Sequence, residues 1–435
     1  MKARLSLVLA LAASFAPLKA SAQAWVNNPN FSEGIGVRAG NLELHPSIGA
    51  EFGYDSNFFR AAESERPVEA LKLRITPSLT LSTLGQRRRL GPPTDVVFSA
   101  GAYASYFELF PLDSEDSDAS KRRNLSLGAN AKVDVFTRRK VGFDLLAGYV
   151  RMIEGEGRTE DLAGEGFNRD TLRGGGGVTW RPGGGTFEWR GGYQATYNFF
   201  ENAVFENLAN LQHEVNTRGR WRFLPRSALL FDSAYTFIRY TKDNTPQSDG
   251  DTVRGRIGFH GLVTYNLALL GMVGWAASFY ERESRQYDSL IGNAEARWFI
   301  QRQPDLQQAT VASGLSSVAL GYNRSFSNAY LGSFYQRDRG YLDFDMFVLG
   351  AVAAGVQFGV SHVAFPESRQ ANGDLNNESF SQLRLDGRAF GEYRFTDTWA
   401  ANLTFLYDKV NSPAVLDDEL EYDRWQAYLG VRWFL

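Results

Sequence analysis

Apolar residues recur at every second position along much of this chain. In the segment 424–435, one face is mostly polar and holds Arg424, Gln426, Tyr428, Gly430, Arg432 and Phe434. The alternate positions are all apolar: Trp425, Ala427, Leu429, Val431, Trp433 and Leu435. A period of two is typical of a β-strand, because successive side chains point to opposite faces. The segment is therefore predicted to be a strand with one apolar face.

The same alternation predicts an all-β protein with eighteen strands. Each predicted strand is about 12–16 residues long, and no composition break divides the chain. The strands are predicted to begin near residues 41, 70, 95, 123, 141, 168, 186, 210, 228, 251, 267, 287, 309, 340, 354, 378, 398 and 421.

The predicted connections alternate between short and long. Short turns at one end and long loops at the other are typical of an outer-membrane barrel, with its turns in the periplasm. An even number of strands then places both ends of the barrel on the periplasmic side. The short turns are 86–89, 137–140, 181–185, 224–227 and 396–398, and the long loops are 109–122, 154–167, 242–250, 325–339, 366–377 and 411–420.

Strand length distinguishes this barrel from the alternative of a large soluble β-sandwich or β-solenoid. Soluble strands cluster near 5–6 residues, whereas a tilted strand needs about 9–11 residues to cross the hydrocarbon. Tryptophans near strand ends suit the aromatic girdles of a membrane barrel. They are Trp180, Trp189, Trp221, Trp298, Trp399 and Trp433. We therefore predict a transmembrane antiparallel up-and-down barrel.

Residues 1–22 have the pattern of a secretory signal peptide. Lys2 and Arg4 precede an apolar run, and Ala20-Ser21-Ala22 forms a small-residue cleavage site. We expect a periplasmic tail at 23–40 and the barrel at 41–435. The chain has no cysteine and a formal net charge of -3, so neither disulfides nor nucleic-acid binding is expected.

The last strand is predicted to close the barrel onto the first. Every backbone polar group in hydrocarbon must be paired, so an open edge is not tolerated. The segment also resembles the C-terminal signal read by barrel-assembly machinery, although Phe434 is penultimate here. The residues assigned to this closing strand are Trp425, Leu429, Val431, Trp433, Phe434 and Leu435.

The segment "LELHPSIGAEFGYDSNFF", residues 42–59, resembles the opening of the β-barrel porin 2 family. The matching residues are Pro46-Ser47 and Tyr54-Asp55-Ser56-Asn57. The resemblance implies an outer-membrane port of a Gram-negative bacterium for export of a secreted polysaccharide, with periplasmic polysaccharide-export proteins as partners. Taken from the residues alone, Asp55 and Asn57 favour a turn at the barrel rim.

A barrel of this size is too wide for its side chains to fill, so an aqueous channel is expected. Opposed rows of arginine and carboxylate along its polar faces can select by charge. They can equally pair with one another and brace the wall. An excess of arginine favours weak anion preference. The predicted pore-lining residues are Arg190, Arg218, Arg220, Arg222, Arg254, Arg256, Arg384, Asp386, Arg388, Arg424 and Arg432.

The loop 325–339 is aromatic and basic, and two interpretations of it stay open. It either folds inward as a constriction or projects outward. For the whole protein, the alternative to an export port is a general small-solute porin, and a third hypothesis is a structural barrel with no open channel.

Catalysis is not indicated by the sequence. The chain has four histidines, and no two of them are closely spaced. By strand phase, His45 and His260 face the lumen, while His213 and His362 face outward or lie near the rim. We expect no enzyme activity, metal or cofactor. Outer-membrane lipid, lipopolysaccharide and barrel-assembly machinery are the expected partners.

Overall fold

The computed structural model describes the chain in segments. The signal peptide predicted at 1–22 and the basic turn at 86–89 lie outside them. So do most of the tail at 23–40 and most of the long loops. The described residues are 36–62, 67–83, 95–112, 124–152, 168–201, 203, 205–242, 245, 247–281, 287–300, 316–328, 334–348, 351–366, 368–369, 375–377, 379–412 and 421–435.

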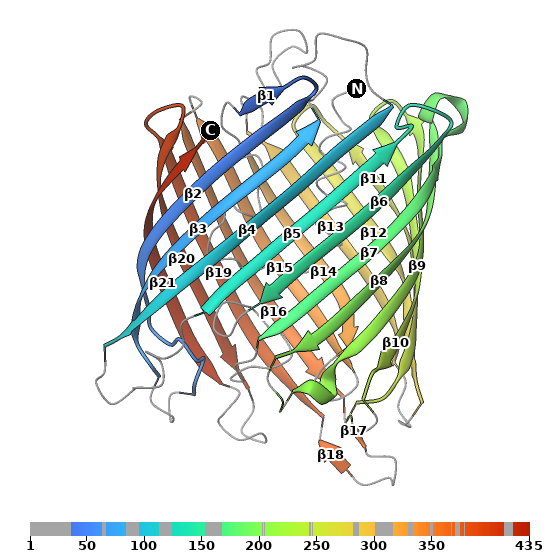
Figure 1. The fold of residues 1–435 in the computed structure, drawn as a ribbon. Helices are drawn as coiled ribbons and strands as arrows, with labels where there is room; N and C mark the ends of the chain where they lie inside the picture. Colours follow the sequence, from blue (N-terminus) through green and yellow to red (C-terminus); the bar gives the residue numbers. More distant parts are fainter. Residues whose placement is uncertain are drawn as a thin grey trace.

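Eighteen long antiparallel strands form one closed barrel, which confirms the predicted fold class (Figure 1). Each is paired with its neighbours in the chain. They are β2 (Leu42–Asp55), β3 (Ala70–Thr83), β4 (Val96–Pro111), β5 (Asn124–Val135), β6 (Val141–Met152), β7 (Arg169–Trp180), β8 (Phe187–Phe200), β9 (Asn210–Leu224), β10 (Ser227–Tyr240), β11 (Gly250–Leu262), β12 (Leu267–Tyr280), β13 (Tyr287–Phe299), β14 (Ser317–Asn328), β15 (Phe334–Val348), β16 (Val352–Phe365), β19 (Phe380–Arg394), β20 (Trp399–Asn411) and β21 (Tyr422–Phe434).

Short secondary-structure elements lie at the two ends of the barrel. At the end where β2 begins, β1 (Val37–Ala39) pairs with the first residues of β2. At the other end, β17 (Ser368–Arg369) and β18 (Leu375–Asn377) form a small hairpin between β16 and β19 (Figure 1). Two 3-10 turns, Pro182–Gly185 and Glu206–Leu208, lie in connections.

The first and last long strands close the barrel, as the alternation of the last segment predicted. β21 pairs antiparallel with β2 over Ser47–Asp55. The backbone N–H of Leu435 extends this pairing by donating to the Pro46 carbonyl at 3.1 Å. Closure pairs the edge strands, which would otherwise expose unsatisfied backbone groups to lipid.

The turns predicted at 137–140, 181–185, 224–227 and 396–398 all connect strands at the end where β2 begins. We assign this end to the periplasm, as is usual for outer-membrane barrels. Two connections there, 84–95 and 300–316, are longer.

Two predicted strand starts were wrong. The strand expected near 309 begins at Ser317, and residues 301–315 lie outside the described part. The strand expected near 340 begins at Phe334. Its start was obscured because Asp338 faces outward, where it pairs with Arg324 of β14 at 2.6 Å.

The loop predicted at 325–339 was also wrong, since most of it is strand. Residues 325–328 end β14 and residues 334–339 begin β15. Both strands continue the barrel wall at these positions. One described residue of this segment does turn inward, because Phe334 is buried against Ala276, Tyr280 and Ile291 on the inner face of β12 and β13.

The outward face of the barrel is a belt of exposed apolar side chains. On β21, Leu429 is 66% exposed, while its neighbours Tyr428 and Gly430 are buried on the inner face. The same alternation occurs around the barrel. Exposed apolar residues on other strands include Phe52, Leu145, Val215, Ile257, Val273, Leu290, Leu320, Val356 and Leu403.

Aromatic residues border this belt at both ends. The six tryptophans predicted for girdles all lie at the periplasmic ends of their strands. The opposite border is mostly tyrosine, and its hydroxyls donate to carboxylates. Tyr235 reaches Asp251 at 2.9 Å and Tyr407 reaches Asp423 at 3.1 Å.

Such a belt with two aromatic borders is the lipid-facing surface of an outer-membrane barrel. The chain is thus an integral protein of a Gram-negative outer membrane. No helix in the described segments is long and apolar enough to cross a membrane.

Candidate functional site: the inner wall of the barrel

The polar side chains of the strands line the inside of the barrel, and they divide into two regions. We call the wall formed by β15, β16, β19, β20, β21, β2 and β3 the seam wall, because it includes the closing strands. We call the wall formed by β8, β9, β10 and β11 the arginine wall. The two regions differ in burial and in how their charges are paired.

Charged groups of the seam wall are buried and paired with one another. Arg432 is 1% exposed and donates to both carboxylate oxygens of Glu392, at 2.8 and 2.7 Å. Arg394 also reaches Glu392, at 3.0 Å. Arg74 and Glu51 form a further buried pair at 3.4 Å. These side chains brace the wall.

Most of the other predicted pore-lining residues of the seam wall are buried and hydrogen-bonded. Arg424 donates to Asp55 at 2.8 Å, and both side chains are buried. Asp386 accepts a hydrogen bond from Arg339. Arg384 donates to Gln382 at 2.8 Å. Arg388, on the same strand as Arg384, is half-buried.

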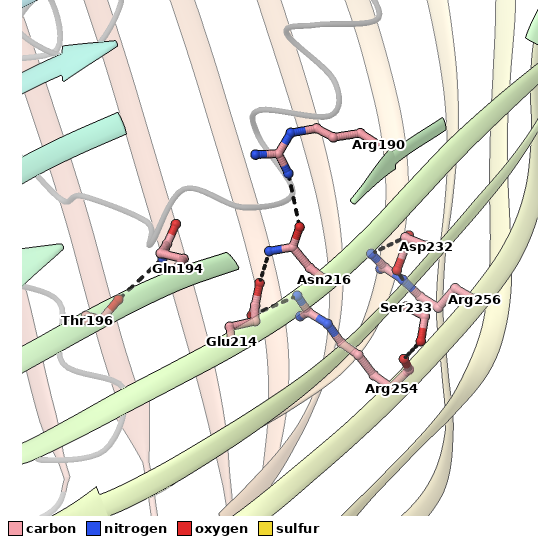
Figure 2. A network of polar contacts seen from close by, with 9 residues as sticks. All are labelled: Arg190, Gln194, Thr196, Glu214, Asn216, Asp232, Ser233, Arg254 and Arg256. Atoms are coloured by element: carbon pink, nitrogen blue, oxygen red, sulfur yellow. Dashed lines mark hydrogen bonds and ion pairs between the residues drawn. The ribbon is translucent and has the colours of Figure 1, made fainter. Parts of the chain in front are cut away.

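Arg190 belongs to the arginine wall and is held by partners from two other strands. It donates to Asp144 of β6 at 2.7 Å. It also donates to Asn216 of β9 at 3.1 Å, as Figure 2 shows. Its guanidinium lies over Gly177 and Gly192. A Cβ at either glycine would come within 2.5 Å of it. The glycine-rich run 173–179 therefore makes room for an arginine in the lumen.

Arg218 differs from its neighbours. It is exposed on the inner face, and within the described residues it has no hydrogen-bond or ion-pair partner. Its cross-strand neighbours are Arg190 on β8 and Asp232 on β10. Asp232 is occupied by Arg256, which donates to both its oxygens at 3.1 and 3.0 Å. Arg218 thus presents to the lumen a guanidinium with no direct partner among the described residues, within the electrostatic reach of the Asp144 and Glu188 carboxylates.

The remaining arginines of this wall are loosely paired and half-buried. Arg220 lies 3.3 Å from Glu188, and Arg254 lies 3.5 Å from Glu214. Arg222, near the periplasmic end, donates to the Gly185 carbonyl at 3.0 Å. Figure 2 shows the Arg254–Glu214 and Arg256–Asp232 pairs together on this wall.

A smaller acidic region lies farther around the barrel. Arg297 of β13 contacts Glu295 at 3.0 Å and Asp343 of β15 at 3.5 Å. Asp345 lies at the limit of an ion pair, 4.0 Å from Arg297. This part of the lumen holds more carboxylates than guanidinium groups, so charge is unevenly distributed around the wall.

The histidines lie on the faces that strand phase predicted. His45 is buried inside beside Glu43 at 3.5 Å, and His260 is half-buried on the inner face. His213 faces outward and hydrogen-bonds Tyr193 at 2.5 Å, and His362 is exposed on the outer face. Among the described residues, no group of His, Asp and Glu is arranged to hold a metal ion.

The first loop, described at residues 56–62 and 67–69, folds inward, which the sequence did not identify. Phe58 is 1% exposed and packs on Ala70, Phe107 and Leu109. These three residues lie on the inner face, opposite the exposed Tyr106 and Phe110. The sequence feature that could have identified this inward loop is the adjacent pair Phe58-Phe59, directly after the Tyr54–Asn57 turn.

No family model matches the chain, and no curated protein matches it by sequence. Solved structures of similar shape include OpdQ of Pseudomonas aeruginosa, with 10% identity and a TM-score of 0.45 over 91% of this chain and 99% of that one. The outer membrane protein OpdK of the same organism has 12% identity and a TM-score of 0.44, covering 90% and 98%. OccAB4 of Acinetobacter baumannii has 11% identity and a TM-score of 0.43, covering 94% and 100%. At these values the likeness carries no information on what this chain binds or transports.

Proposed function

We propose that the protein is an outer-membrane diffusion channel for small solutes, with a preference for anions. The observation that carries this proposal is Arg218, whose guanidinium is exposed in the lumen without a partner among the described residues. A passing anion is attracted to a positive charge without a direct partner on a pore wall, and charged side chains of this kind set ion selectivity.

The difference in burial between the arginines of the two walls supports a path for solutes along β8–β11. The guanidinium groups of Arg424 and Arg432 in the seam wall are buried in ion pairs, so they are unavailable to a solute. The guanidinium groups of the arginine wall belong to half-buried or exposed side chains, so a solute can reach them. We infer that Arg190, Arg218, Arg220, Arg222, Arg254 and Arg256 line the path.

The export port implied by the sequence resemblance is not supported by these observations. Nothing in the described lumen is specific to a polymer, and the first loop occupies part of the mouth. The small-solute channel therefore fits better than the polysaccharide port.

The experiment is a reversal-potential measurement on the refolded protein in a planar bilayer under a salt gradient. We expect an open channel with weak anion preference, and we expect Arg218→Ala to shift the reversal potential toward neutral selectivity. Arg324→Ala is the matched control. Arg324 faces outward and pairs with Asp338, so its removal should leave selectivity unchanged.

Two results would contradict the proposal. A wild-type barrel without conductance would exclude a diffusion channel. Equal reversal potentials for the wild type and Arg218→Ala would exclude Arg218 from the ion path.

A further inference from the structure

The motif Tyr54-Asp55-Ser56-Asn57 lies where the first strand, the last strand and the first loop meet. Each of its residues contacts β21. The Tyr54 ring lies on the outside, 4.6 Å between centroids from Trp425. Ser56 exchanges two hydrogen bonds with the Trp425 backbone, at 3.0 and 2.9 Å. The motif therefore ties the two closing strands together at the extracellular end.

Asp55 is the charged centre of this junction. Its side chain is fully buried, and its carboxylate accepts hydrogen bonds from Arg424 at 2.8 Å and from Gln426 at 2.5 Å. The same carboxylate accepts the backbone N–H of Asn57 at 3.3 Å. One buried group thus fixes both the strand pairing and the start of the loop.

Asn57 shapes the loop that follows. Its side-chain amide donates to the Ala61 carbonyl at 2.7 Å and accepts from the Ala61 N–H at 2.9 Å. It also donates across the junction to the Asp423 carbonyl at 3.3 Å. These bonds fold residues 57–61 into a compact turn. Arg60 within it has a positive φ of 57°.

The turn directs aromatic side chains into the barrel. Phe58 packs on the inner face of β3 and β4, with its ring centroid 6.1 Å from that of Phe107. The ammonium of Lys72 lies over the Phe107 ring at 4.2 Å. A cation over an aromatic face stabilises such packing when it is shielded from water. Phe58 and Ala62 are both buried, so the loop is packed in the mouth.

We propose that the described start of the first loop, residues 56–62, is a constriction at the extracellular mouth of the channel, and that Asp55 and Asn57 hold it there. The role in transport rests on the proposed function, whereas the packing of the loop does not. Asp55 and Asn57 are positioning residues, which act by placing Phe58 in the mouth.

The test compares single-channel conductance of the wild type with that of Asn57→Ala and Phe58→Ala. We expect both variants to show higher conductance, because the loop loses its internal bonds or its inward anchor. Lys242→Ala is the control, since Lys242 is an exposed residue after β10 whose pairing with Glu206 lies outside the mouth. Resistance of each barrel to unfolding in detergent at room temperature shows that it has assembled.

A thiol-labelling measurement tests the position of the loop without relying on transport. The chain has no cysteine, so Ala62→Cys introduces a single reactive group. Because Ala62 is 2% exposed, we expect slow labelling in the otherwise wild-type barrel and fast labelling when Asn57→Ala is added. Fast labelling of Ala62→Cys alone would overturn the inference.

The two proposals fail in different ways. If the wild type conducts and the loop variants conduct equally, the constriction is wrong and the channel stands. If the wild type shows no conductance and the loop variants do conduct, the open diffusion channel is overturned and the constriction is supported as a closed mouth. If neither the wild type nor the loop variants conduct, the channel is overturned, and the role of the loop as a constriction is overturned with it.

Discussion

At the residue scale, arginines in similar sequence settings have opposite roles. Arg218 and Arg432 both occupy the polar face of an amphipathic strand, and both were predicted to line the pore. Arg432 is buried with Glu392, whereas Arg218 is exposed without a partner in the described part of the chain. The difference comes from the neighbouring strands, because Glu392 pairs with Arg432 while also accepting from Arg394, whereas both oxygens of Asp232 beside Arg218 are bound by Arg256.

This difference predicts opposite effects of substitution on stability. Arg432→Ala leaves Glu392 buried with only Arg394 beside it, and breaking a buried pair costs about 3–5 kcal/mol. Arg218→Ala removes an exposed, unpaired group and is expected to change stability by about 0.5 kcal/mol or less. Denaturant unfolding of both variants in lipid vesicles measures the two free energies. Similar losses for the two would show that Arg432 is not a bracing residue.

At the element scale, each strand is specified by what its two faces touch. β21 shows this clearly, because it presents Trp425, Leu429 and Val431 to lipid and buries Arg424, Tyr428 and Phe434 inside. A shift of one residue in its pairing with β2 would exchange these faces. The register Phe52 with Leu429 is therefore fixed by burial on both sides.

The lipid contact of β21 predicts a depth-dependent cost for charge. Leu429 lies near the middle of the strand and Trp433 lies near its periplasmic end. Leu429→Arg should destabilise the barrel by about 2–4 kcal/mol, and Trp433→Arg should add a charge cost of only about 0–1 kcal/mol, because an interface hydrates the guanidinium. Denaturant unfolding in lipid vesicles measures the free energy of unfolding of both variants. A larger loss at 433 than at 429 would contradict the assigned membrane position.

At the scale of the whole molecule, the closed barrel has two different ends. One end carries most of the short turns and the start of β2, and the other carries the small hairpin and the first loop (Figure 1). The assignment of the turn end to the periplasm has a direct test, because the chain has no cysteine of its own.

Single cysteines at the two ends predict opposite labelling in intact cells. Lys242→Cys lies beyond the extracellular end of β10, and Tyr265→Cys lies in the turn between β11 and β12, where the side chain is 77% exposed. A thiol reagent that does not cross the membrane should label position 242 and not position 265. Labelling of both after cell disruption is the control. The reverse labelling pattern in intact cells would show that the barrel has the opposite orientation in the membrane.

Most of the fold was predictable because the governing signal is local. Alternation within one strand reveals its two faces, and it placed the four histidines on the faces where the structure has them. It failed near 334, where the outward charges of Asp338 and Arg324 neutralise each other across two strands. The alternation of apolar and polar residues within one strand cannot reveal an ion pair that forms between two strands.

The amino-acid sequence by itself determined the barrel class, the strand phases, the lipid-facing belt and the closure of the last strand on the first. Each of these follows from periodicity along the chain. Only the tertiary structure decided which guanidinium groups are paired and which loop folds inward. Asp55 and Arg424 are 369 residues apart in the sequence and meet only because the barrel closes. Charge pairing depends on which strands become neighbours, and that is a property of the closed molecule.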